Sequence, residues 1–165
     1  ELYSKVLWKL HGLSSIGLRF FNVYGPRQDP SSPYSGVISI FVDKILKCKK
    51  VTINGGDQTR DFVYIDDVVR ALYKSLILCQ DQCVNDNINI LTGIESSIIE
   101  LFTTISNEIN IPNTKILKPM LVGDPYKSNG TSLKMQELLD LDIESFTSLN
   151  EGLRRTIEFM RNTDG

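Results

Sequence analysis

The run SIGLRFFNVY, residues 15–24, is nearly continuous in Ile, Leu, Phe and Val and stops at the turn pair Gly25-Pro26. A short apolar run that is bounded by a turn signal is typical of a strand. Strands that are buried on both faces carry such unbroken runs, whereas half-buried strands alternate apolar and polar residues. The run therefore predicts one strand of a parallel sheet with both of its faces covered.

Helical and extended segments alternate around this strand. Before it, Tyr3, Leu7 and Leu10 recur at helical spacing, and Gly12 is suited to end that helix. After it, the sequence patterns predict helices over 37–46, 68–79, 98–110, 132–139 and 149–160 and strands over 51–53, 59–64 and 87–91. Such alternation is typical of the α/β class, in which helical crossovers join parallel strands.

Local signals add detail to these elements. Asn-Gly-Gly-Asp at 54–57 predicts a hairpin-like turn, and Pro112 and Pro119 frame a stretch that we expect to be irregular. Ser96 or Ser97 is expected to cap the helix over 98–110, with Glu100 at capping-box spacing from Ser97.

Asp66 or Asp67 is expected to cap the helix over 68–79. Helical spacing places four residues of that helix on one face, namely Val68, Leu72, Leu76 and Cys79.

Composition excludes several classes of function. The 165 residues fit one domain or slightly more, and a net charge of −2 gives no reason to expect nucleic acid or an anionic membrane as a partner. No apolar run is long enough for a membrane span, so we expect a cytoplasmic protein. Three cysteines (Cys48, Cys79 and Cys83) and the single His11 are too few and too scattered for a metal site, and none is predicted.

Two sequence motifs carry more specific information than the α/β fold class. LRFFNVYGPRQDP at 18–30 and GGDQTRDFVYIDDVVRAL at 55–72, in this order, closely resemble the extended short-chain dehydrogenase/reductase family, in the subgroup that acts on nucleotide sugars. The resemblance implies the C-terminal part of a Rossmann-like parallel sheet interleaved with a small substrate-binding α/β domain. It covers essentially the whole chain, so residues 1–165 are expected to be the C-terminal half of such a protein.

The NAD-binding half of the family is expected to be absent from these residues. The family carries Tyr-x-x-x-Lys on the helix before the LRFFNVYGP strand, but Tyr3 and Lys5 are two residues apart. The pair Gly55-Gly56 is not the Gly-rich strand–loop–helix that holds a dinucleotide pyrophosphate. The resemblance implies NAD in the full-length enzyme, and we expect neither NAD nor a catalytic residue on this chain alone.

The resemblance assigns substrate-binding roles to five residues. Arg60 would approach the diphosphate of a nucleotide sugar, for which a guanidinium is well suited. Asn22 would contact the same group, Val37 and Ile38 would lie near a uracil base, and Thr52 would flank it. The alternatives are an arginine that pairs with Asp61, an asparagine that satisfies only loop backbone, and a plain core helix over 37–46.

Two further features concern the ligand. Arg27 and Gln28 lie in the RQDP loop, and the sequence of this loop resembles that of UDP-sugar 4-epimerases in particular. Leu121 stands where the family often has a second arginine for the diphosphate, and the loss of that contact would cost about 1.5–3 kcal/mol. Lys118 or Lys127 could replace it.

The leading hypothesis is the substrate-binding portion of an NAD-dependent UDP-glucose or UDP-N-acetylglucosamine 4-epimerase. A nucleotide-sugar 4,6-dehydratase of the same family and a non-catalytic sugar-nucleotide-binding remnant stay open. In either case a nucleotide-diphosphate sugar, preferably a UDP-sugar, is the expected ligand. Apolar surfaces that the other half of the family fold would cover predict a homodimer or larger oligomer.

Overall fold

The computed structural model describes residues 1–32 and 34–163. The helices are α1 (Leu2–His11), α2 (Val37–Leu46), α3 (Ile65–Asp81), α4 (Ile98–Ile109), α5 (Leu133–Leu139) and α6 (Leu149–Thr163), with the 3-10 turn η1 (Ile143–Ser145). The strands are β1 (Ser15–Phe20), β2 (Asn22–Tyr24), β3 (Val51–Asn54), β4 (Thr59–Tyr64), β5 (Asn85–Ile90), β6 (Glu95–Ser97), β7 (Lys115–Lys118) and β8 (Lys127–Ser128).

The strand pairing confirms the predicted α/β class. β1 pairs with β5, β2 with β4, β3 with β7 and β4 with β8 in parallel, and β4 and β6 form the single antiparallel pair of the described residues. The expected helices all form, and α1 ends at Gly12 in the left-handed conformation (φ 64°). None of the helices in the described residues is long and apolar enough to cross a membrane.

The strand predicted over residues 15–24 differs from its prediction in two respects. It breaks at Phe21 into β1 and β2, which pair with different strands. The prediction of full burial is wrong for β1, where no residue is fully buried and Phe20 is 46% exposed. Within the described residues β5 is the single strand partner of β1 and the helix α3 packs against β1, so part of the strand stays uncovered.

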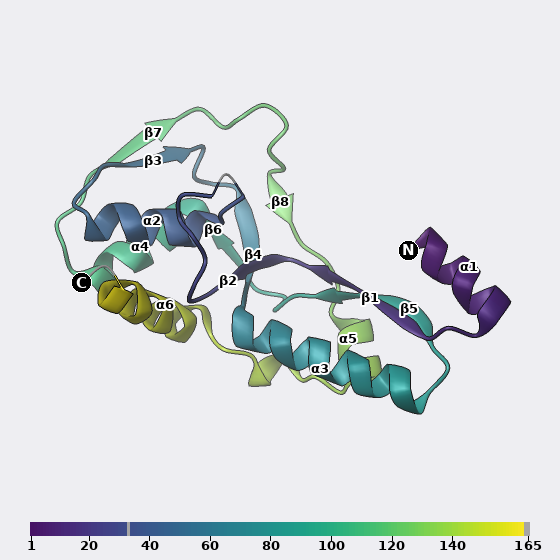
Figure 1. Cartoon of the computed structure of the whole chain (residues 1–165). Helices are drawn as coiled ribbons and strands as arrows, with labels where there is room; N and C mark the ends of the chain where they lie inside the picture. The colour runs from purple at the N-terminus through teal and green to yellow at the C-terminus, as the bar shows by residue number, and fades with distance from the viewer. Residues whose placement is uncertain (33, 164–165) are drawn as a thin grey trace.

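The described residues form two apolar cores, and Figure 1 shows that the elements of each core lie on different sides of the β2–β4 pair. The first is enclosed by α2, α4 and α6, which pack against one another beside the β2–β4 pair. The second lies between the β1–β5 pair and the helices α3 and α5. The β2–β4 pair carries residues of both cores, so its strands connect them.

α6 approaches the first core closely at Gly152. A Cβ atom at this position would lie 2.1 Å from Tyr24 Oη and 2.9 Å from Tyr64 Cδ2. The two tyrosine rings contact each other edge to face, with centroids 5.6 Å apart. The absence of a side chain at Gly152 therefore sets the distance between α6 and the strands.

The predicted start and inner face of α3 are wrong. The helix begins after Tyr64 with no side-chain cap, and Asp67 instead accepts hydrogen bonds from the Arg70 guanidinium and from Thr147 N. The buried positions include Val68, Ala71 and Ser75, whereas Leu72 and Leu76 are 49% and 56% exposed. The error arose because α3 carries apolar residues on two faces, and only one of them packs on the sheet.

The Gly55-Gly56 turn is present but does not form a hairpin, because β3 and β4 belong to different sheets. β3 pairs instead with β7, a strand inside the stretch that was expected to be irregular. The capping box of α4 is confirmed, since the Ser97 hydroxyl accepts from Glu100 N while the Glu100 carboxylate accepts from Ser97 N.

Candidate functional site

A cavity of about 710 Å³ lies among β2, β3, β4, α2 and the loop that follows β7. Ligand pockets of roughly 300–1,000 Å³ are common, so its size suits a nucleotide sugar. Asn22, Val37, Thr52 and Arg60 all line this cavity. Ile38 does not, because its side chain is buried in the first core. The structure thus brings together four of the five residues that the sequence singled out.

Arg60 is the cation of the cavity wall. Its side chain is 13% exposed, and its guanidinium pairs with Asp124 Oδ1 at 2.5 Å. It also donates to the carbonyl oxygens of Thr59 and Pro125 at 2.7 and 2.8 Å. The alternative pairing with Asp61 is not found. Three backbone and side-chain acceptors therefore hold the guanidinium in one position before any ligand arrives.

Asn22 lies at the first residue of β2 and donates Nδ2–H to the carbonyl oxygen of Asp61 at 2.9 Å. The bond ties β2 to β4, so the asparagine does satisfy a backbone group. A carboxamide has two N–H donors and one acceptor oxygen, and one bond leaves further capacity for a ligand.

Asp61 is one residue beyond Arg60, but its side chain points into the fold. Its carboxylate accepts from Thr92 N and Oγ1, both at 2.9 Å, and from Gly93 N at 2.7 Å. Burial raises the pKa of the Asp61 carboxyl above its usual value, and these hydrogen bonds oppose the rise. Asp61 therefore fixes the strand from which Arg60 projects.

Gln58 and Asp124 complete a network that sequence reasoning did not find. Gln58 Oε1 accepts from Gly56 N at 2.5 Å, and its Nε2 donates to Asn54 O at 2.6 Å and lies 3.4 Å from Asp124 Oδ2. Asp124 in turn pairs with Arg60. The sequence signals were the place of Gln58 inside the motif at 55–72 and the place of Asp124 three residues after Leu121, the position compared above with a family arginine.

The rest of the wall is largely apolar. α2 contributes Val37, Ile40 and Phe41, and the loop after β7 contributes the exposed Leu121 and Val122. In Figure 1 this loop runs from β7 across to β8, so it bridges the strands that hold the two sides of the cavity. Neither of the expected substitute cations, Lys118 and Lys127, is among the residues that line the cavity.

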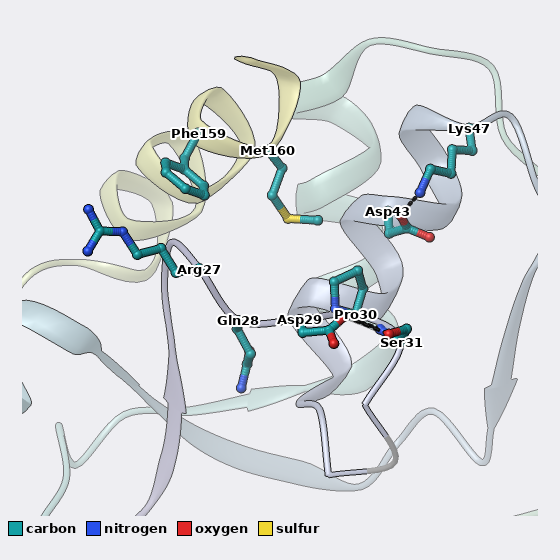
Figure 2. Close-up of a pocket in the computed structure, with 9 residues that line it drawn as sticks. All are labelled: Arg27, Gln28, Asp29, Pro30, Ser31, Asp43, Lys47, Phe159 and Met160. Atoms are coloured by element: carbon teal, nitrogen blue, oxygen red, sulfur yellow. Dashed lines mark hydrogen bonds and ion pairs between the residues drawn. The ribbon is translucent and has the colours of Figure 1, made fainter. Parts of the chain in front are cut away.

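Arg27 and Gln28 belong to a second cavity, of about 410 Å³, which Figure 2 shows. Phe159 and Met160 reach into it from α6, and the ion-paired Asp43 is on α2. Gln28 Oε1 is buried without a hydrogen-bond partner among the described residues. This second cavity is lined by the loop after β2, and none of the five predicted site residues takes part in it.

The Gly-rich turn at Gly55-Gly56 differs from a dinucleotide-binding loop. The Gly55-Gly56 turn leads into β4, and the next helix, α3, begins only after that strand. A dinucleotide pyrophosphate is normally held where a Gly-rich loop opens directly into a helix N-terminus. This turn therefore lacks the geometry of a pyrophosphate cradle.

Comparisons with known proteins identify the family of the chain. Residues 1–90 match the model of the NAD dependent epimerase/dehydratase family. The chain is 38% identical over 165 residues to a putative UDP-glucose 4-epimerase of Methanocaldococcus jannaschii, covering 99% of this chain and 51% of that protein. It is 33% identical over 163 residues to the UDP-glucose 4-epimerase of Mycolicibacterium smegmatis, covering 98% of this chain and 50% of that protein.

Among solved structures, the crystal structure of UDP-glucose 4-epimerase from Thermotoga maritima with UDP-glucose superimposes with a TM-score of 0.89. The two sequences are 36% identical, and the match covers 99% of this chain and 51% of that chain. The chain spans about half the length of the curated relatives it matches. The family model covers more than half of these 165 residues, and we conclude that the chain belongs to the NAD dependent epimerase/dehydratase family.

Proposed function

We propose that this chain forms the sugar-nucleotide-binding part of an NAD-dependent UDP-sugar 4-epimerase, with NAD held by a Rossmann half outside residues 1–165. The observation that carries the proposal is the cavity that gathers Asn22, Val37, Thr52 and Arg60. Several relatives are named UDP-glucose 4-epimerases, and these names favour a uridine nucleotide over nucleotides of other bases.

In the proposed complex, Arg60 binds the diphosphate. Its guanidinium is already oriented by Asp124, and a preorganised cation loses less entropy on binding than a mobile one. Asn22 donates its second N–H to the same group, and Val37 and Thr52 lie at the base. These residues orient the substrate, and the reacting C4 hydroxyl of the sugar would extend toward the NAD-binding half.

Replacement of Arg60 tests the proposal. We expect Arg60→Gln to weaken UDP binding by about 10- to 150-fold, because a charge-assisted hydrogen bond contributes about 1.5–3 kcal/mol. Isothermal titration calorimetry of the chain with UDP measures the change. Arg27→Gln is the matched control, since this exposed arginine lines the second cavity. Equal affinities for the wild type and Arg60→Gln, or no UDP binding by the wild type, would contradict the proposal.

We also propose that the chain self-associates. α1 exposes Leu2, Tyr3 and Leu10, and α3 exposes Leu72 and Leu76, in addition to the partly exposed β1. Apolar surface of this kind favours association. Light scattering at micromolar concentration is expected to give the mass of a dimer or a larger species, and a single species with the 18.6 kDa mass of one chain would overturn this prediction.

A further inference from the structure

β7 is an edge strand with one free side. It pairs with β3 alone, and no other strand of the described residues lies beside it. Figure 1 shows β7 on the outer side of β3. All four residues of Lys115–Lys118 are exposed. An exposed edge strand offers unpaired backbone groups to which another chain can add as a strand.

The hydrogen bonds of β7 show which backbone groups point to the free side. Lys118 O accepts from Gly55 N at 2.8 Å, so this carbonyl faces β3. The N–H and C=O groups of alternate residues in a strand point to opposite sides. Those of Lys115 and Leu117 therefore point away from β3, where they supply two donors and two acceptors to an added strand.

The side chains give this edge an apolar centre and positive ends. Ile116 and Leu117 are 42% and 59% exposed, and a lysine stands on each side of the pair. The segments 44–56 and 109–123, which contain β3 and β7 with their flanks, hold six lysines and no acidic residue. The charge of the chain is thus unevenly distributed, although its net value is −2. An acidic partner matches this edge.

A second copy of β7 is a poor partner for the same edge. The sequence KILK is nearly symmetric, so antiparallel pairing of two copies would place Lys115 opposite Lys118 at both ends. Like charges directly opposite each other destabilise a strand pair. Lysines on edge strands also discourage pairing between identical edges.

Carboxylates at those two positions would instead pair with the lysines, and apolar residues between them would cover Ile116 and Leu117. We propose that the free edge of β7 binds an extended acidic segment of a partner protein, in which two acidic residues flank two apolar ones. Lys115 and Lys118 are three positions apart and lie on opposite faces of the strand, and acidic residues at the same spacing alternate in the same way. This surface lies outside the cavity of the proposed function, because no residue of β7 lines that cavity.

Two short peptides test the proposal. The peptide TEVVET carries the acidic pattern, which is symmetric and can pair in either strand direction, and TKVVKT is its control with reversed charge. We expect TEVVET to bind and to shift the amide signals of Lys115 and Leu117 in NMR titrations of the folded chain, while the signal of Arg60 stays in place. TKVVKT is expected to cause no such shift. Equal responses to the two peptides, or no response to TEVVET, would overturn the proposal.

Leu117→Pro tests the role of the backbone. Proline removes the N–H that points to the free side and leaves the hydrogen bonds between β7 and β3 in place, as edge strands permit. We expect it to weaken TEVVET binding by about ten-fold, because a backbone hydrogen bond is lost and its acceptor in the peptide is left unpaired. Leu117→Ala keeps the N–H and is the matched control, expected to bind more tightly than Leu117→Pro. Binding of TEVVET by Leu117→Pro with wild-type affinity would contradict the proposed strand addition.

A charge reversal tests the role of the lysines with a gain of binding, which an unfolded protein cannot give. The double variant Lys115→Glu with Lys118→Glu is expected to bind TKVVKT and to lose TEVVET. Circular dichroism confirms that the variant is folded. A folded variant that kept the wild-type preference for TEVVET would overturn the assigned role of the two lysines.

Discussion

Asp61→Ala is expected to lower the free energy of unfolding by about 3 kcal/mol, because it leaves three donors at Thr92 and Gly93 without an acceptor inside the protein. Asp61 is 1% exposed, so water cannot replace the lost carboxylate without opening the structure. Urea denaturation followed by circular dichroism measures the change.

The control for Asp61 is its near neighbour Asp66. The Asp66 carboxylate is 64% exposed and lies 3.6 Å from Arg155. Exposed ion pairs of this kind contribute about 0–1 kcal/mol to the free energy of unfolding. Asp66→Ala is therefore expected to shift the midpoint of urea denaturation little. If both variants unfolded at the same urea concentration, the assigned role of Asp61 would be wrong.

Gly152→Ala is the second substitution with a large expected effect, and its sign is unusual. Alanine stabilises an exposed helix interior by about 1 kcal/mol relative to glycine. At Gly152 the added methyl group would lie 2.1 Å from Tyr24 Oη, so α6 must move away from the core. We expect a loss of about 2–3 kcal/mol, as is typical of an overpacked core.

A double-mutant cycle identifies the clash. In a Tyr24→Phe background the nearest atom is gone, and Gly152→Ala is expected to cost at least about 1 kcal/mol less than it does alone. Asn150→Ala, at an exposed position of α6, is the control and is expected to be neutral or slightly stabilising. Thermal unfolding of the four chains of the cycle gives the coupling, and a stabilised Gly152→Ala protein would refute the close packing of α6.

Some local signals in the sequence predicted the ends of elements well, because capping residues act within a few positions. Ser97 with Glu100 located the start of α4, and Gly12 located the end of α1. Long-range pairing was not predictable in the same way. The Gly55-Gly56 turn is compatible with a hairpin, and only β7, more than 60 residues after β3, shows that β3 has another partner. α3 likewise has two apolar faces, and its sequence does not show which of them packs on the sheet.

For the site, motif resemblance located Arg60 and Asn22, but it did not reveal what holds them. The ion pair of Arg60 with Asp124 joins segments that are 64 residues apart, and no periodicity reports such a contact. Asn54 also lines the cavity, and it could have been found from alternation in β3, since a polar residue at that position is on the same face as Thr52. The resemblance assigned Ile38 to the ligand together with Val37, although helical geometry turns neighbouring side chains about 100° apart.

The first core also has a consequence for how the chain folds. It joins Tyr24 to Leu153 and Ile157, and Tyr24 Oη donates to Leu149 O across 125 positions of sequence. Contacts between such distant positions require large loops to close, and folding rates fall as the mean sequence separation of contacts rises. During synthesis on the ribosome this core stays incomplete until α6 has emerged. A nascent chain that stops before Leu149 would expose the apolar sides of α2 and α4, which makes it a substrate for chaperones and a source of aggregation.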